Sequence, residues 1–148
     1  MRFYGRMPLR FPDNDLAMTS TTPAPLIYVI DDDTDVLGSL RFLLETDGFD
    51  VRTFRSAAAL LSVSIANEAD CYVIDYKMPA MSGIDLANSL RNRHAAAPII
   101  LITGYPDAGI REKAAAAGIR HVLLKPHIEE SLASHIRGAI QEGPATRR

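Results

Sequence analysis

The chain has little of what marks secreted, membrane or nucleic-acid-binding proteins. It has no tryptophan and a single cysteine, Cys71, so no internal disulfide can form. That cysteine use agrees with a reducing compartment, and we expect a cytoplasmic location. No apolar run is long enough to cross a bilayer. The formal net charge of −2 offers no basic surface, so we expect no direct binding to nucleic acid.

Length and composition predict one folded domain. The 148 residues, 47% hydrophobic and 23% charged, suit a globular domain large enough to bury a core. Residues 1–24 combine arginines with a Thr/Ser/Pro-rich tract, and we expect a disordered extension there. We expect the domain over residues 25–141 and a flexible tail over residues 142–148, which is too short for an output domain.

Four short apolar runs each end in a residue with useful chemistry. Runs rich in Val, Ile and Leu, separated by helix-like segments, are typical of buried strands in a parallel sheet. The runs and the residues that follow them are Leu26–Ile30 before Asp31 and Asp32, Cys71–Ile74 before Asp75, Ile99–Ile102 before Thr103, and Val122–Leu124 before Lys125. Because ligands bind at the carboxyl ends of such strands, we expect these side chains to converge at one edge.

Helical patterns alternate with the apolar runs along the domain. Val51–Phe54 alternates apolar and polar residues and predicts an edge strand. We expect helices over residues 35–45 (capped by Asp33 or Thr34), from Ser56 through Ile65, and over residues 84–93, 107–117 and 128–141. This repeat predicts an α/β fold, a flavodoxin-like doubly wound sheet of five parallel strands in the order 2-1-3-4-5 with helices on both faces.

The expected cluster has the composition of a metal and phosphoryl site. Carboxylates from Asp31, Asp32 and Asp75 would repel one another unless a cation neutralised them, and Mg²⁺ prefers oxygen-rich sites of this kind. The cation would allow an anionic phosphoryl group to approach, and Asp75 could attack that group as a nucleophile. The Thr103 hydroxyl and the Lys125 ammonium would then bind the phosphoryl oxygens.

Five short motifs hold these residues in a characteristic order. They are Ile30-Asp31-Asp32, Ile74-Asp75-Tyr76-Lys77-Met78-Pro79, Met81-Ser82-Gly83, Ile102-Thr103-Gly104 and Leu124-Lys125-Pro126. Together they resemble the receiver domain of two-component response regulators over about residues 25–141, and FixJ-type receivers most. The resemblance implies a signalling module, not a metabolic enzyme, in which Asp75 accepts a phosphoryl group from a histidine kinase or a histidine phosphotransfer protein.

The resemblance also implies the remaining roles in the site. Mg²⁺ would be held by Asp31, Asp32, Asp75 and the backbone carbonyl of Lys77. Thr103 would be the switch hydroxyl and Lys125 the salt-bridging lysine. The face made by the fourth helix, fifth strand and fifth helix would form a homodimer or bind a downstream protein.

Two positions depart from the family pattern. Val122 stands three residues before Lys125, where receivers commonly carry Tyr or Phe, and a β-branched side chain has no ring to swing. Tyr105 is a candidate substitute for that ring. His127 stands where FixJ-type receivers tend to have Phe, directly after Pro126, whose preceding peptide bond the resemblance implies to be cis. The route of the signal out of the site is therefore open.

Two alternatives remain. One is a receiver-like binding module whose output does not depend on phosphorylation. The reason to consider it is Val122, which lacks the usual aromatic ring. The other is a small phosphatase of the haloacid-dehalogenase type, because Asp31–Thr34 contains Asp-x-Asp. That second family requires Gly before the Thr and a larger chain, and this sequence has neither.

Overall fold

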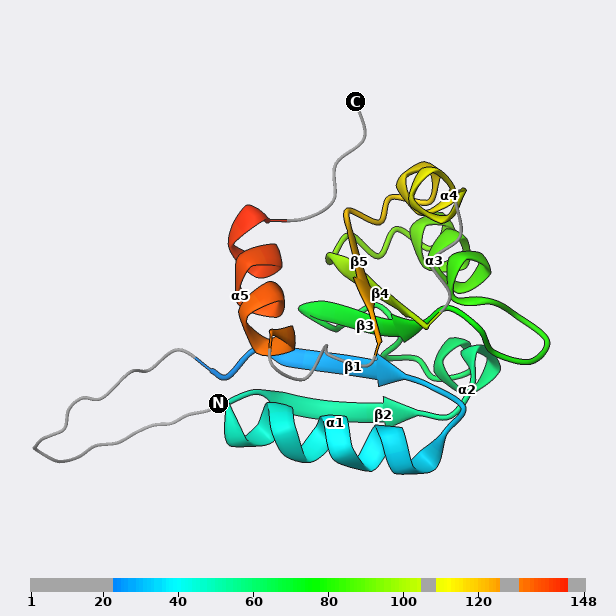
Figure 1. Cartoon of the computed structure of the whole chain (residues 1–148). Coiled ribbons are helices and arrows are strands. Elements are labelled where there is room, and N and C mark those ends of the chain that lie inside the picture. Colours follow the sequence, from blue (N-terminus) through cyan, green and yellow to red (C-terminus); the bar gives the residue numbers. More distant parts are fainter. Residues whose placement is uncertain (1–22, 105–108, 126–130, 144–148) are drawn as a thin grey trace, which may run out of the picture.

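Strands and helices alternate along the chain in the computed structural model, which describes residues 23–104, 109–125 and 131–143 (Figure 1). The strands are β1 Leu26–Ile30, β2 Asp50–Phe54, β3 Cys71–Asp75, β4 Ile99–Thr103 and β5 His121–Leu124. Neighbouring strands pair in parallel in the order β2-β1-β3-β4-β5. The predicted fold class and strand order are confirmed.

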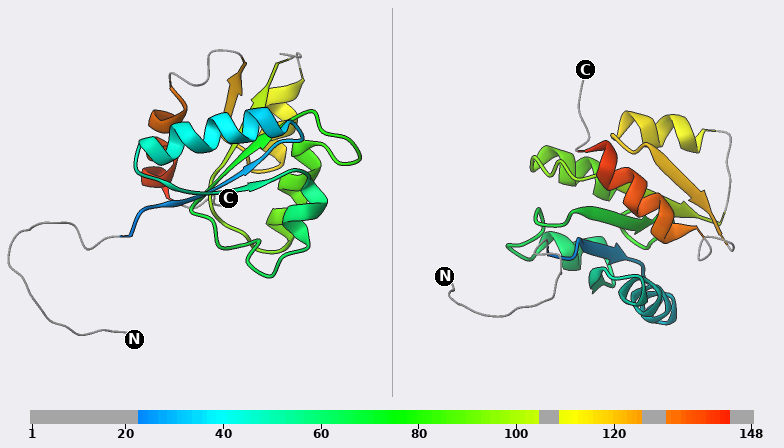
Figure 2. Two further views of the ribbon diagram at one scale, coloured as in Figure 1. Left: turned by 90° about the horizontal axis from the view of Figure 1, so that it is seen from below. Right: turned by 90° about the vertical axis from the view of Figure 1, so that its left-hand side faces the viewer.

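The inner strands are buried because their side chains are apolar on both sides of the sheet. In β1, Ile27 and Val29 face a core that includes residues of α1 and α5, whereas Tyr28 and Ile30 face a core shared with α2, α3 and α4. Helices therefore cover both faces of the sheet (Figure 2). Such two-sided burial explains the continuous apolar runs in the sequence. The edge strand β2 keeps Asp50 and Arg52 exposed, as its alternating pattern predicts.

The helices are α1 Thr34–Thr46, α2 Ala57–Leu61, α3 Gly83–Asn92, α4 Ile110–Ala116 and α5 Leu132–Glu142. Asp33 is the N-cap of α1, since its side chain accepts hydrogen bonds from the backbone N–H groups of Asp35 and Val36. None of the described helices has the length and apolar character that a bilayer crossing requires.

The prediction that the second helix extends through Ile65 was wrong. α2 ends at Leu61, and residues 62–66 form turns. The hydroxyl of Tyr28 in β1 donates to the carbonyl of Ile65 at 2.8 Å, and the hydroxyl of Tyr72 in β3 donates to the carbonyl of Ala66 at 2.6 Å. Contacts from two strands thus hold this segment in a non-helical path.

Several predicted features lie outside the described residues. They are the N-terminal extension up to residue 22, the starts of the last two helices at Asp107 and Ile128, the tail from residue 144, and the predictions for Tyr105, Pro126 and His127. They stay predictions.

Candidate metal and phosphoryl site

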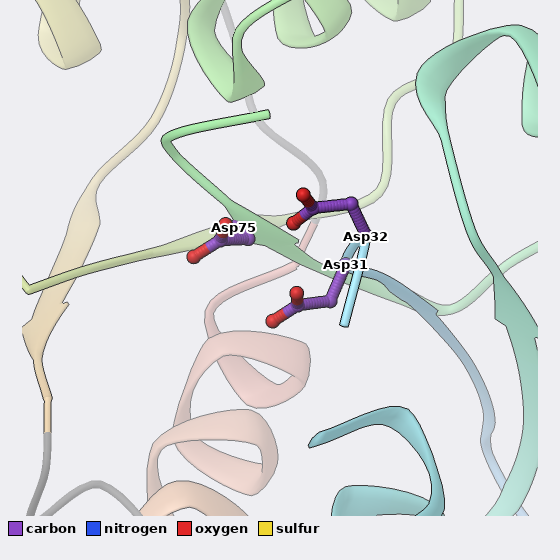
Figure 3. Close-up of side chains that lie close together, drawn as sticks. All are labelled: Asp31, Asp32 and Asp75. Carbon is purple, nitrogen blue, oxygen red and sulfur yellow. The ribbon is translucent and has the colours of Figure 1, made fainter. Parts of the chain in front are cut away.

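The carboxyl edge of the sheet brings the three predicted acids together. Asp31 directly follows β1, and Asp75 is the last residue of β3, which pairs with β1. Oxygens of Asp31, Asp32 and Asp75 all lie within 4.8 Å of one another, and the carboxyl groups point to the same side (Figure 3). Asp31 is 4% and Asp75 7% exposed, whereas Asp32 faces solvent. The site is therefore a partly buried acidic cluster with one open side.

Lys125 reaches this cluster from the edge strand β5. It follows β5, which is separated from β3 by β4. Its Nζ lies 3.0 Å from Oδ1 of Asp75 and 3.9 Å from Oδ2 of Asp31. The Lys125 side chain thus passes the end of β4, and its ammonium group brings one positive charge to the acids.

Thr103 and Lys77 flank the cluster. Thr103 is the last residue of β4, lies between the strands that carry Asp75 and Lys125, and is buried. Its carbonyl accepts the backbone N–H of Lys125 at 2.9 Å, which holds the base of that lysine beside β4. Lys77 follows Asp75 by two residues and helps to line an open pocket of about 380 Å³ with Tyr76, Met78 and Ser82.

Burial and neighbouring charges shift the pKa values of the ionisable groups in the site. Burial raises the pKa of the Asp31 carboxyl to about 6, against the lowering effect of the Asp33 N–H that it accepts at 2.9 Å, and the Asp75 charge raises it further. Burial also raises the pKa of Asp75, although its hydrogen bond from Lys125 partly offsets this. Burial alone would lower the pKa of Lys125, but that bond and the nearby carboxylates raise it above its ordinary value. Both buried acids therefore favour a neutralising partner.

The donor set fits Mg²⁺. The three convergent carboxylates are oxygen ligands of the kind a hard divalent cation prefers, and the open side would leave room for water or phosphoryl oxygens. The single charge of Lys125 leaves the three acids with a net negative charge when they are ionised. A divalent cation would remove the remaining repulsion.

Gly83 is a residue of the site that sequence reasoning named only as part of a motif. It is the first residue of α3, after the N-cap Ser82, and its N–H donates to the carbonyl of Tyr76 at 2.8 Å. A side chain at this position would collide with the carbonyl of Asp75. In the sequence Gly83 only ends the loop motif before the predicted helix over residues 84–93, and nothing in that pattern signals a close approach to Asp75.

Val122, the main departure from the family pattern, is part of the core. It is buried in the same cluster as Ile110 and Ala114 of α4. Val122 therefore contributes a small branched side chain to the core that α4 shares.

Comparison with known proteins agrees with this geometry. Residues 27–137 match the response regulator receiver domain family. The chain is 36% identical over 124 residues to the response regulator protein TodT of Pseudomonas putida, covering 84% of this chain and 55% of that protein. It is 35% identical over 116 residues to the transcriptional regulatory protein FixJ of Bradyrhizobium diazoefficiens, covering 78% of this chain and 57% of that protein. The chain thus spans little more than half the length of these curated relatives.

Solved structures show the same fold. A response regulator receiver domain protein from Clostridium thermocellum superposes with a TM-score of 0.73 at 31% identity, covering 80% of this chain and 95% of that chain. The family match disfavours the haloacid-dehalogenase alternative, because residues 27–137, which contain the acidic cluster and all but the first residue of the described strands, fit the receiver family. This chain belongs to the receiver domain family of two-component response regulators.

Proposed function

We propose that this receiver takes a phosphoryl group onto Asp75 from a histidine kinase or a histidine phosphotransfer protein. Receiver domains interact with histidine kinases and downstream targets, and they typically bind Mg²⁺ at an acidic cluster. The observation that carries the proposal is the convergence of Asp31, Asp32 and Asp75 with the Lys125 ammonium 3.0 Å from Asp75. Asp31, Asp32, Asp75 and the backbone carbonyl of Lys77 are the proposed Mg²⁺ ligands.

The chain's own residues would divide the work of the transfer. An oxygen of Asp75 attacks the phosphorus, the bond between phosphorus and the donor's histidine nitrogen breaks, and that nitrogen leaves with the bonding electron pair. Lys125 exchanges its bond to Asp75 for one to a phosphoryl oxygen, and Thr103 donates its hydroxyl hydrogen to another. The cation, when bound, neutralises charge on both reacting groups.

Phosphorylated Asp75 would change the surface that the domain presents to its partners. Phosphorylation at Asp75 would draw in Thr103 and Lys125, the last residue of β4 and the residue after β5. Movement there would alter the face formed by α4, β5 and α5, which we propose as the surface for a homodimer or a downstream protein. The domain would catalyse only its own phosphorylation and dephosphorylation, and would work in the cytoplasm without touching nucleic acid.

Labelling by a small phosphodonor tests this proposal. Wild type incubated with acetyl phosphate or phosphoramidate should take up one phosphoryl group when Mg²⁺ is present and none when EDTA removes it. Asp75→Asn should abolish the labelling, since an amide is not a nucleophile here. Labelling of Asp75→Asn at the wild-type level would sink the assignment.

One observation favours a binding module with phosphorylation-independent output. Val122 is packed in the core and has no ring that could swing inward on phosphorylation. Under that alternative, wild type and Asp75→Ala should capture the same partner with equal affinity, with or without beryllofluoride. Capture by beryllofluoride-treated wild type alone would favour the phosphorylation-dependent switch.

A further inference from the structure

Position 83 requires glycine because there is no space for a side chain, and not because of its backbone conformation. It is not among the described residues with positive φ, so its dihedral angles suit any L-residue. A Cβ atom on Gly83 would lie 2.5 Å from the carbonyl oxygen of Asp75, 2.8 Å from Cδ1 of Leu101 and 3.0 Å from Cγ2 of Ile74. The nearest of these atoms is backbone and cannot rotate away.

Both sides of this contact are held in place. On the strand side, Asp75 is paired with Ile102 in β4, and the next N–H, of Tyr76, donates to the Ile102 carbonyl at 2.8 Å. On the helix side, α3 is seated by side chains with no exposed surface, Leu86, Ala87 and Leu90. A methyl group at Gly83 would therefore displace either the end of β3 or the start of α3.

The loop between the two elements offers little slack. The N–H of Gly83 donates to the carbonyl of Tyr76 at 2.8 Å, which closes the loop on itself. Within the loop, the N–H of Met81 donates to the carbonyl of Pro79 at 2.7 Å, and Ala80 has a φ of 71°, a conformation that costs energy for a residue with a side chain. A displacement at Gly83 would thus be passed to Asp75 and Tyr76.

We infer that Gly83 is a positioning residue for the phosphoacceptor: its missing side chain lets α3 sit on the main chain of Asp75 and so sets where the Asp75 carboxylate meets Asp31, Asp32 and Lys125. The inference rests on the proposed function for its phosphorylation readout. Its Mg²⁺-binding readout does not need phosphoryl transfer, so the two can fail separately.

The test compares two glycine-to-alanine changes. Gly38 lies in α1 with no atom within 4 Å of an added Cβ, so Gly38→Ala is the matched control. Gly83→Ala should weaken Mg²⁺ binding about tenfold and slow labelling by acetyl phosphate about ten- to a hundredfold, as expected for a shift of about 1 Å at a reacting group. Both are measured well below the melting temperature, with Mg²⁺ affinity taken from calorimetry. Gly38→Ala should match wild type in both.

Two further variants separate positioning from loss of packing. Leu90→Ala weakens the same helix without touching Asp75, and should lower the melting temperature while leaving Mg²⁺ affinity unchanged. Gly83→Ala combined with Leu101→Val removes one of the three collisions but keeps the one with the Asp75 carbonyl. It should regain stability without regaining the labelling rate, and it carries the test if Gly83→Ala alone does not fold.

The opposite results would overturn the inference. They are wild-type Mg²⁺ affinity and labelling in folded Gly83→Ala, an equal loss of Mg²⁺ affinity in Leu90→Ala, or recovery of the labelling rate in the double variant. Absence of label on wild type would instead contradict the proposed function, and the Mg²⁺ affinities would still decide the role of Gly83.

Discussion

Aspartates lie both where the strands begin, called the amino edge of the sheet, and where the strands end, called the carboxyl edge. They have different roles at these two edges. At the amino edge, Asp70 is exposed, and its Oδ2 accepts the N–H of Leu26 at the start of β1 at 2.7 Å. At the carboxyl edge, Asp31 and Asp75 are buried, and Asp32 lies beside them. Asp70 accepts its backbone N–H away from other acids, whereas Asp31, Asp32 and Asp75 crowd around one space, where Asp31 accepts the N–H of Asp33.

The direction of the strands explains this difference. The described strands are all parallel, so all of them begin at the amino edge and end at the carboxyl edge, where the side chains at their ends converge. A carboxylate at the amino edge can accept from the backbone, as Asp70 does. At the carboxyl edge, Asp31 accepts one backbone N–H, that of Asp33, and Lys125 brings a single positive charge to Asp31 and Asp75, so a bound cation would complete their neutralisation. The same residue type is therefore structural at one edge and available for chemistry at the other.

The largest expected effect is on Mg²⁺ affinity, which should depend on the acids at the carboxyl edge and not on Asp70 at the amino edge. Asp31→Asn or Asp32→Asn removes a proposed ligand and should weaken Mg²⁺ binding by about a hundredfold or more, because even indirect partners of ligands are worth about ten- to a hundredfold. Asp70→Asn should bind Mg²⁺ like wild type. Calorimetric titration with Mg²⁺ measures all three, and equal losses in Asp31→Asn and Asp70→Asn would remove the distinction between the edges.

A second prediction concerns acidity in the metal-free protein. The folded state raises the pKa of Asp31 from 3.8 to about 6, so it favours the protonated acid. The resulting stabilisation is complete below about pH 4 and is lost as the pH rises through about 6. The raised pKa of Asp75 acts in the same direction. With EDTA present, the protein should be more stable at pH 5 than at pH 7, by about 1 kcal/mol from Asp31 alone.

Chemical denaturation followed by circular dichroism measures this difference, since the chain has no tryptophan. Asp31→Asn should be more stable than wild type at pH 7 and should flatten the pH profile, whereas Asp70→Asn should keep the wild-type profile. Saturating Mg²⁺ should reverse the trend, because the cation binds the ionised acids. A flat profile for the metal-free wild type would contradict the electrostatic account of the carboxyl edge.

The smallest effect belongs to the amino edge. Asp70→Ala removes the acceptor of the Leu26 N–H and should cost about 1 kcal/mol of stability, the usual worth of one hydrogen bond. Phosphorylation by acetyl phosphate should not change. A slower labelling reaction in this variant, with stability intact, would mean that the two edges are coupled.

The fold could be predicted from the sequence because local pattern and tertiary structure agree there. The apolar runs of β1, β3 and β4 are buried on both faces, and each places its last or following residue at the same edge. The convergence of Asp31 and Asp75 follows from their places at the ends of paired neighbouring strands. The end of α2 could not be predicted, because the tyrosine hydroxyls that hold residues 65 and 66 come from other strands.

The remaining features depend on distances that no sequence pattern encodes. Asp33 and Thr34 are both good N-cap residues, and only the hydrogen bonds to Asp33 decide between them. The close approach of Gly83 to the Asp75 carbonyl depends on how α3 packs on β3. The first feature is settled by local hydrogen bonds at the start of α1, and the second by the tertiary packing of α3 on β3.

The position of the phosphoryl group tests the central claim most directly. Protein treated with acetyl phosphate and Mg²⁺ can be reduced with borohydride, which converts an aspartyl phosphate to homoserine, and the modified residue can be located by peptide mass spectrometry. The account predicts homoserine at residue 75, and none when Mg²⁺ is withheld. Homoserine at Asp31, Asp32 or Asp70, or its formation without Mg²⁺, would contradict it.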